Sequence, residues 1–276
     1  MKSMSRWGAL GVAGSAIIGS SLIGITQALA LPQEQIVKKL GPVPVFTITD
    51  SKGAPLVASV PSQQNQQQGA QNRQSQTSVA GVFINQRDAQ AFVEDLKKKN
   101  PELAKTVRVV PVSLAEVYKL DQGQGKPNSL DIAYVPSKQQ VDAALTVMRQ
   151  SGQKNANQFN GTPLFVARAG KEKGYLTVKQ ANQQIIPFFF NKDELQSMLD
   201  RFKKQQPNLA STVEIQVVNL EGVLQTLQTR NDQQLNQIML IPPQESIKFV
   251  QSLQPASNQN QRPAAPANRT QNAPRR

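Results

Sequence analysis

Residues 82–117, VFINQRDAQAFVEDLKKKNPELAKTVRVVPVSLAEV, and residues 188–223, FFFNKDELQSMLDRFKKQQPNLASTVEIQVVNLEGV, are two copies of one pattern. A shift of 106 residues lays Asn85 on Asn191 and Pro101 on Pro207. Without a gap, IAYVPSKQQVDAAL from Ile132 then matches IMLIPPQESIKFVQ from Ile238. Because chance does not hold a register over so long a stretch, the chain is predicted to contain a duplicated unit.

The copies also match upstream, at a different shift. VPVF at Val43 lies over TPLF at Thr162, a shift of 119 residues. The 13 extra residues of the first copy fit the Gln-rich stretch PSQQNQQQGAQNRQSQTS, which starts at Pro61. We therefore expect a first repeat at residues 40–150, with a disordered loop at 62–78, and a second repeat at 160–253.

Each copy opens with two alternating runs around a short turn, typical of a hairpin, and continues with an apolar strand. A helix follows, because Ala89, Phe92, Val93 and Leu96 recur at helical spacing. Asn85 and Asn191 suit its N-cap, and the helix should end before each proline. Two strands alternating with two further helices complete the pattern, and SLAEV at Ser113 has the spacing of a capping box that starts the first of these helices. The prediction is a mixed α/β fold, a duplicated β-β-β-α-β-α-β-α unit with pseudo-twofold symmetry, in one sheet or two lobes.

The run Phe188-Phe189-Phe190 lies in the apolar strand of the second copy, opposite Val82-Phe83-Ile84. Apolar residues at successive positions predict a strand covered on both faces. Since side chains alternate, Phe188 and Phe190 should share one face and Phe189 the other. We expect Phe189 in the shared core and any groove beside Phe188 and Phe190.

The N-terminus has the pattern of an export signal. Lys2 and Arg6 precede an uncharged stretch from Trp7 to about Ile25, and Ala28-Leu29-Ala30 fits a small-x-small cleavage site. We expect residues 1–30 to be removed after Ala30 and the mature protein to lie in the periplasm. An uncleaved membrane anchor and the thylakoid lumen are the alternatives.

Composition narrows the function. The formal net charge of +13 favours an anionic partner, yet the aromatic residues sit in apolar strands apart from the Lys and Arg, which argues against nucleic acid. The chain has no Cys and no His, so the commonest nucleophiles, bases and metal ligands are missing. We predict a protein that is not an enzyme, with no catalytic residues, no metal and no cofactor.

The segments VPVFTITDSKGAPL, GVFINQRDAQAFVEDLKKKNPELA, VVPVSLAEVYKL and YVPSKQQVDAAL resemble the Tic22 family of soluble chloroplast protein-import components, over roughly Leu40 to Leu253. The export signal is similar to the cyanobacterial, periplasmic branch. The resemblance implies a chaperone-type factor that assists outer-membrane protein biogenesis and associates with an Omp85-class assembly barrel. It implies a pseudo-symmetric α/β fold with apolar grooves.

Two functions remain open at this point. A client-holding factor would bind extended protein clients with apolar side chains, for which the candidates are Phe46, Phe83, Phe165, Phe188 and Phe190, although each also suits an ordinary core. A passive structural adaptor would instead bridge partner domains and an anionic membrane surface. The disordered tail at 255–276 would make that contact through Arg262, Arg269, Arg275 and Arg276.

Overall fold

The computed structural model describes residues 30–61, 76–122, 130–180, 182–230 and 232–253. The predicted signal peptide, except Ala30, and the Arg-rich tail lie outside these residues, as does most of the predicted Gln-rich loop. The loop predicted at 62–78 overlaps the start of a strand, which begins at Gln76.

The first half begins with a helix and contains the first sheet. In chain order its elements are α1 (Gln33–Leu40), β1 (Pro44–Asp50), β2 (Val57–Pro61), β3 (Gln76–Phe83), α2 (Gln86–Lys99), α3 (Pro101–Thr106), β4 (Val107–Ser113), α4 (Leu114–Asp121), β5 (Leu130–Val135) and α5 (Lys138–Gln150).

The second half follows a similar order around a second sheet, without a counterpart of α1. Its elements are β6 (Pro163–Ala169), β7 (Gly174–Tyr175), β8 (Val178–Gln180), β9 (Gln183–Phe189), α6 (Lys192–Gln205), α7 (Pro207–Ala210), β10 (Glu214–Asn219), α8 (Leu220–Thr229), the 3-10 helix η2 (Gln233–Gln237), β11 (Ile238–Ile241) and α9 (Gln244–Ser252).

The main strands of the two sheets are arranged alike. In the first sheet β4, β1, β3 and β5 are neighbours in that order, and in the second β10, β6, β9 and β11 are. The last pair is parallel in both, and the other pairs are antiparallel. Phe46 pairs with Phe83 in one sheet, and Phe165 with Phe189 in the other. The fold is mixed α/β as predicted, with two sheets, and is compatible with a duplicated unit.

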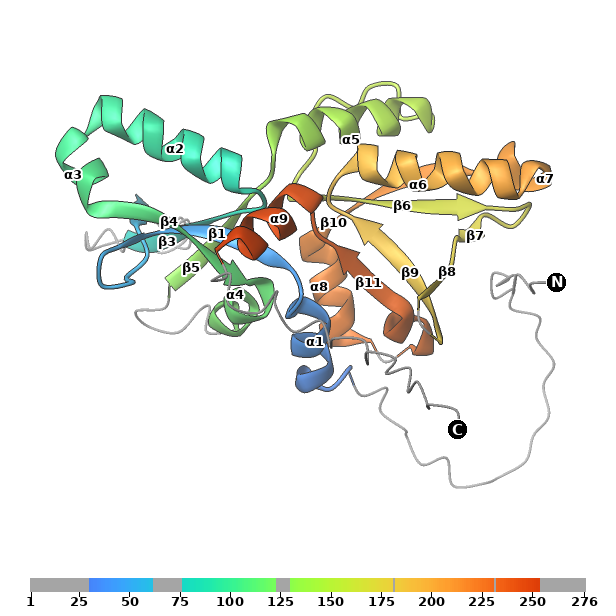
Figure 1. Ribbon diagram of the computed structural model, residues 1–276, viewed down its shortest axis with the longest axis horizontal. Helices are drawn as coiled ribbons and strands as arrows, with labels where there is room; N and C mark the ends of the chain where they lie inside the picture. Colours follow the sequence, from blue (N-terminus) through green and yellow to red (C-terminus); the bar gives the residue numbers. More distant parts are fainter. Residues whose placement is uncertain (1–29, 62–75, 123–129, 181, 231, 254–276) are drawn as a thin grey trace, which may run out of the picture.

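The last helix of each half packs on the sheet of the other half. Ala144 and Val147 of α5 join the core cluster around Phe165, and Phe249 of α9 contacts Phe46 with ring centroids 5.7 Å apart. Figure 1 shows α5 beside α6 above the second sheet, while α9 leaves β11 towards β1. The two halves therefore exchange helices.

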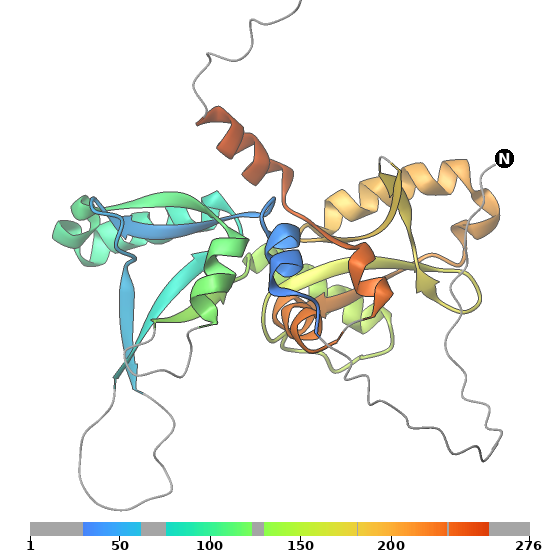
Figure 2. The same ribbon diagram turned by 90° about the horizontal axis from the view of Figure 1, so that it is seen from below.

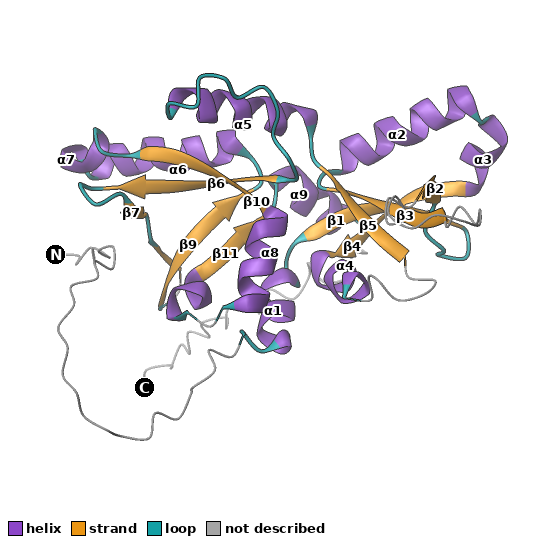
Figure 3. Ribbon diagram, turned by 180° about the vertical axis from the view of Figure 1, so that it is seen from behind, coloured by secondary structure: helices purple, strands orange, loops and turns teal. Residues whose placement is uncertain are grey.

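A single apolar cluster joins the halves on the opposite side of the sheets. There α1, α4 and α8 gather between the two sheets (Figure 3) and contribute Ile36, Leu40, Leu114 and Leu220, all buried. Both sheets contribute strand residues to this cluster, so it forms a core shared by the two halves, beside a smaller cluster on the other face of each sheet.

The local signals read from the sequence were largely correct. Asn85 and Asn191 accept backbone N–H donors at the starts of α2 and α6, and Ser113 forms a capping box with Glu116. The two prolines do end these helices, but each also begins a further short helix, α3 or α7, that was not predicted. Proline suits such a first position because its missing N–H has no intrahelical acceptor there.

The predicted hairpins are only partly present. After a turn at Gly53, β2 leaves β1 and pairs with β3, and in the second half the expected return strand divides into β7 on β6 and β8 on β9. Helix α1 was not predicted at all, although Ile36 and Leu40 are one helical turn apart and both are buried.

Candidate functional site

β11 is the edge strand of the second sheet, and a groove runs along its free side. All four of its residues, Ile238 to Ile241, line one cavity of about 1010 Å³. Successive residues of a strand point to opposite faces of the sheet. A cavity that touches four in succession must therefore follow the strand's edge, where both faces can be reached. We call this cavity the edge groove.

Two helices form the walls of the edge groove. Gln35, Lys38 and Lys39 of α1 line one side, and Ile247, Lys248 and Gln251 of α9 line another. A second cavity of about 410 Å³ lies on the far side of α9, bounded by the end of β4, and shares Pro42, Ile247 and Gln251 with the groove. In Figure 2, α9, the red helix, projects from the body of the protein. Residues of this helix line both cavities.

The edge groove combines apolar and cationic side chains. Ile185, Met239, Ile241 and Ile247 are among its apolar residues, and the lining residues in the described part of the chain include three lysines but no Asp or Glu. Lys39 Nζ donates to the carbonyl oxygens of Asn236 at 2.8 Å and Ile238 at 3.1 Å. Its burial lowers the pKa of the ammonium group below the ordinary value.

Helix α9 is anchored mainly at its N-terminal end. The N–H of Gln244 donates to Glu194 Oε1 of α6 at 2.9 Å, Arg87 of α2 pairs with Glu245 at 3.2 Å, and the fully buried Ser246 donates to the carbonyl of Ile84. Towards the other end, Leu253 is 55% exposed. α9 thus holds one wall of the groove while leaving much of its own surface open.

The Glu194 anchor should make stability depend on pH. Burial raises the pKa of the Glu194 carboxyl above its ordinary value, and Glu245 adds to this, while the Gln244 N–H acts against it. The folded protein therefore favours the neutral form of this carboxyl. The stabilising contribution of the group is fully present below its ordinary pKa and is lost as pH rises through its raised pKa in the folded protein. Glu194→Gln keeps an acceptor for Gln244 and removes the titrating group, so its stability should fall less than that of the unaltered protein as pH rises from about 4 to about 7. Urea unfolding at each pH measures this, and parallel curves would contradict it.

A further cavity of about 330 Å³ lies between α8, η2 and the second sheet, on the face that Phe188 shares with Phe190. Phe188, Val223 and Leu235 line it, with Arg230 and Asp232 also in the lining. The ring of Tyr175 lies 5.9 Å from that of Phe188. This cavity is large enough for a few apolar side chains.

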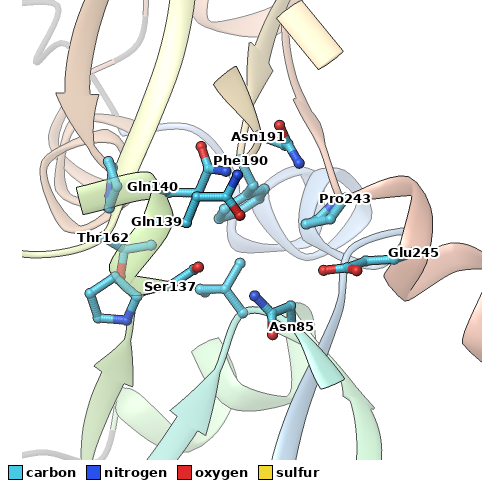
Figure 4. A pocket seen from close by; sticks show the side chains of 12 residues that line it. Asn85, Ser137, Gln139, Gln140, Thr162, Phe190, Asn191, Pro243 and Glu245 are labelled. Carbon is cyan, nitrogen blue, oxygen red and sulfur yellow. The ribbon is translucent and has the colours of Figure 1, made fainter. Parts of the chain in front are cut away.

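A fourth cavity lies where the two halves meet, and Figure 4 shows its lining. Asn85 and Asn191, which correspond in the repeat, approach it from opposite halves, with Phe190, Gln140 and Thr162 around them. Gln140 Oε1 accepts the N–H of Lys192 at 2.9 Å and so ties α5 to α6. The cavity measures only about 30 Å³, room for about one water molecule, so it belongs to the junction rather than to a protein client.

The structure places all five candidate phenylalanines in the core, where none is more than 5% exposed. Phe46 and Phe83 lie in the first half's cluster, Phe165 in the second half's, and Phe188 and Phe190 in the central one. None lines the edge groove. Phe188 lines the cavity of about 330 Å³ between α8, η2 and the second sheet, and Phe190 lines a small cavity where the halves meet. That a groove beside these two rings holds a client, or that any of the five contacts one, stays a prediction.

The alternation predicted for the triple phenylalanine was correct. Phe188 and Phe190 point into the central cluster, and Phe189 points into the cluster beneath α5 and α6. The residues that matter for the groove were missed, since Ile238 to Ile241 and Ile247 had been assigned only to a strand and a helix stripe. One signal was available: β11 is the last strand in the described part of the chain, so no later strand can cover its free side.

The described residues contain no cluster of three or more His, Cys, Asp or Glu side chains that could hold a metal ion. No helix among them is long and apolar enough to cross a membrane.

Comparisons with known proteins show which family the chain belongs to. A curated relative from Arabidopsis thaliana, "Protein TIC 22, chloroplastic", is 24% identical over 83% of this chain and 74% of its own length. The structure of Anabaena Tic22, titled as protein transport, matches 82% of this chain and 99% of its own with a TM-score of 0.69 and 34% identity. Tic22 from Plasmodium falciparum shares the fold, with a TM-score of 0.57 and 21% identity over 79% of this chain and 96% of its own. The profile of the Tic22-like family matches residues 4–252, and the chain belongs to that family.

Proposed function

We propose that this protein acts in protein transport by holding extended segments of client proteins in the edge groove, without catalysing a reaction. The observation that carries the proposal is the groove itself, a cavity of about 1010 Å³ along an unpaired strand edge, lined by the apolar residues of β11 and by a mixture of polar and apolar side chains around them. Family membership supports a transport role, since the related Anabaena structure is titled as protein transport.

The size and shape of the groove favour a polypeptide over a small molecule. Pockets for small molecules span about 300–1,000 Å³ and enclose most of their ligand. The edge groove is at the top of that range and continues past α9 into a second cavity. Each client side chain buried there contributes about 1.5–3 kcal/mol to binding, before the cost of ordering the segment is subtracted. Two or three such side chains therefore give a moderate affinity, which suits a protein that must also release its client.

The cellular setting completes the proposal. The N-terminal export pattern and the family resemblance support a periplasmic factor that assists outer-membrane protein biogenesis beside an Omp85-class barrel. Its partners would be unfolded outer-membrane clients and that assembly barrel. The adaptor alternative depends on the tail at 255–276, outside the described residues, and stays a prediction.

An aggregation assay tests the holding function. An unfolded outer-membrane barrel protein is diluted from urea into buffer, with and without the mature chain, and light scattering is followed. Holding predicts that scattering falls as the chain approaches a one-to-one ratio with the client, and that a photo-crosslinker at Met239 captures the client. Undiminished scattering together with no crosslink would refute the proposal.

A further inference from the structure

The backbone of β11 offers hydrogen bonds to its free side at few points. The N–H of Phe190 donates to the carbonyl of Ile241 at 3.2 Å, so Ile241 turns its backbone groups towards β9. Because successive residues of a strand turn these groups to opposite sides, Met239 also faces β9, whereas Ile238, Leu240 and Pro242 face the free edge.

Most of that edge is already satisfied or lacks a donor. The N–H of Ile238 donates to the carbonyl of Leu235, and its own carbonyl accepts from Lys39 Nζ. Pro242 has no N–H to donate. Such blocking prevents open-ended strand addition, which exposed edges otherwise invite. Leu240 is left as the edge residue with both a donor and an acceptor facing the groove.

The charged side chains that line the groove have one sign, although Glu194 lies behind Gln244 and interacts with Lys248. Lys38 and Lys39 stand on α1 and Lys248 on α9, and no carboxylate of the described residues lines the groove with them. The ammonium group of Lys39 uses two of its three N–H donors in hydrogen bonds to the carbonyl oxygens of Asn236 and Ile238. One N–H donor remains for a ligand. An apolar trough edged by lysines is complementary to an apolar segment that also carries carboxylates.

We propose that the edge groove selects short extended segments in which apolar and acidic side chains alternate. One residue of the segment exchanges two backbone hydrogen bonds with Leu240. Because side chains of an extended chain alternate, the apolar ones meet Met239, Ile241 and Ile247 while the carboxylates meet the lysines. The occupant is thus an internal acidic–apolar segment of a client, and this selectivity rests on the proposed holding function.

Binding of blocked peptides to the mature protein tests the side-chain selectivity. The probe is fluorescein-labelled Val-Asp-Phe-Asp-Val-amide, and its relatives carry Asn or Lys in place of both Asp. In fluorescence anisotropy at low salt, the Asp peptide should bind about tenfold more tightly than the Asn peptide, and the Lys peptide should bind most weakly. The difference should shrink at high salt, because the lysines are partly exposed.

Protein variants locate the effect. The double variant Lys38→Gln, Lys248→Gln should bind the Asp peptide about tenfold more weakly than the unaltered protein does. Its affinity for the Asn peptide should be unchanged. Lys154→Gln, at an exposed lysine outside the groove, is the matched control and should change neither. In this probe the residue paired with Leu240 is one of the two Asp, so methylating the backbone nitrogens of both Asp removes the donor that faces Leu240 and should weaken binding about fivefold.

The outcomes separate this inference from the proposed function. Equal binding of the Asp and Asn peptides, or an unchanged preference in the double variant, would overturn the selectivity. A third result would also overturn the selectivity: an Asn peptide with a free C-terminal carboxylate that binds as tightly as the Asp peptide. The groove would then recognise the end of a chain rather than acidic side chains within a segment. If no peptide binds but aggregation is still suppressed, only this inference fails, whereas loss of both results refutes the holding function as well.

Discussion

Replacing Phe165 by alanine should lower the free energy of unfolding by about 3–5 kcal/mol. The ring is fully buried between the second sheet and helices α5 and α6, and packs with Leu195, Leu199 and Ala144. Its removal leaves a cavity that backbone hydrogen bonds of β6 prevent from closing. Unfolding in guanidinium chloride, followed by far-UV circular dichroism, measures the loss.

The same experiment tests whether the halves fold together. Ala144 comes from the first half, so damage at Phe165 should destabilise the whole chain in one transition. Phe92→Ala is the control, since that ring is 45% exposed, and it should cost less than about 1 kcal/mol. A variant whose first half still melts at the original denaturant concentration would show that the exchanged helices do not couple the halves.

Changing Ile247 to aspartate should abolish most client holding while leaving the fold intact. Ile247 lines both the edge groove and the adjoining cavity, and it is only partly buried, so the fold tolerates the change. A carboxylate in the apolar part of the trough must lose its water when a client side chain covers it, which is costly. In the light-scattering assay the variant should need about ten times more protein for the same protection.

Leu120→Asp supplies the matched comparison for this prediction. Leu120 is 61% exposed on α4 and does not line the groove, so the same type of change there should leave protection unaltered. If Ile247→Asp protects as well as the unaltered protein, or if Leu120→Asp fails equally, the groove is not the holding surface.

Local signals predicted much of this fold. The 106-residue shift paired Asn85 with Asn191, and both cap helices; the spacing of Ala89 and Val93 identified the buried stripe of α2; and the capping box at Ser113 identified α4. Each depends on contacts between residues a few positions apart, so composition and spacing suffice to find them. The phenylalanine run was readable for the same reason, since alternation within a strand is a local rule.

The candidate site was less predictable, because it depends on which elements meet. Nothing in PSKQQVDAAL or PPQESIKFVQ indicates that α5 packs on the second sheet and α9 on the first, yet this exchange puts α9 beside the free edge of β11. Whether β11 is an edge, and whether Lys39 reaches its carbonyls, depends on contacts about 200 residues apart in the chain. Residue type and spacing were enough to predict the mixed α/β class, the corresponding elements of the two halves and their helix caps. Which apolar residues belong to the core and which line a groove became clear only from the folded chain, because burial is set by long-range packing rather than by residue type.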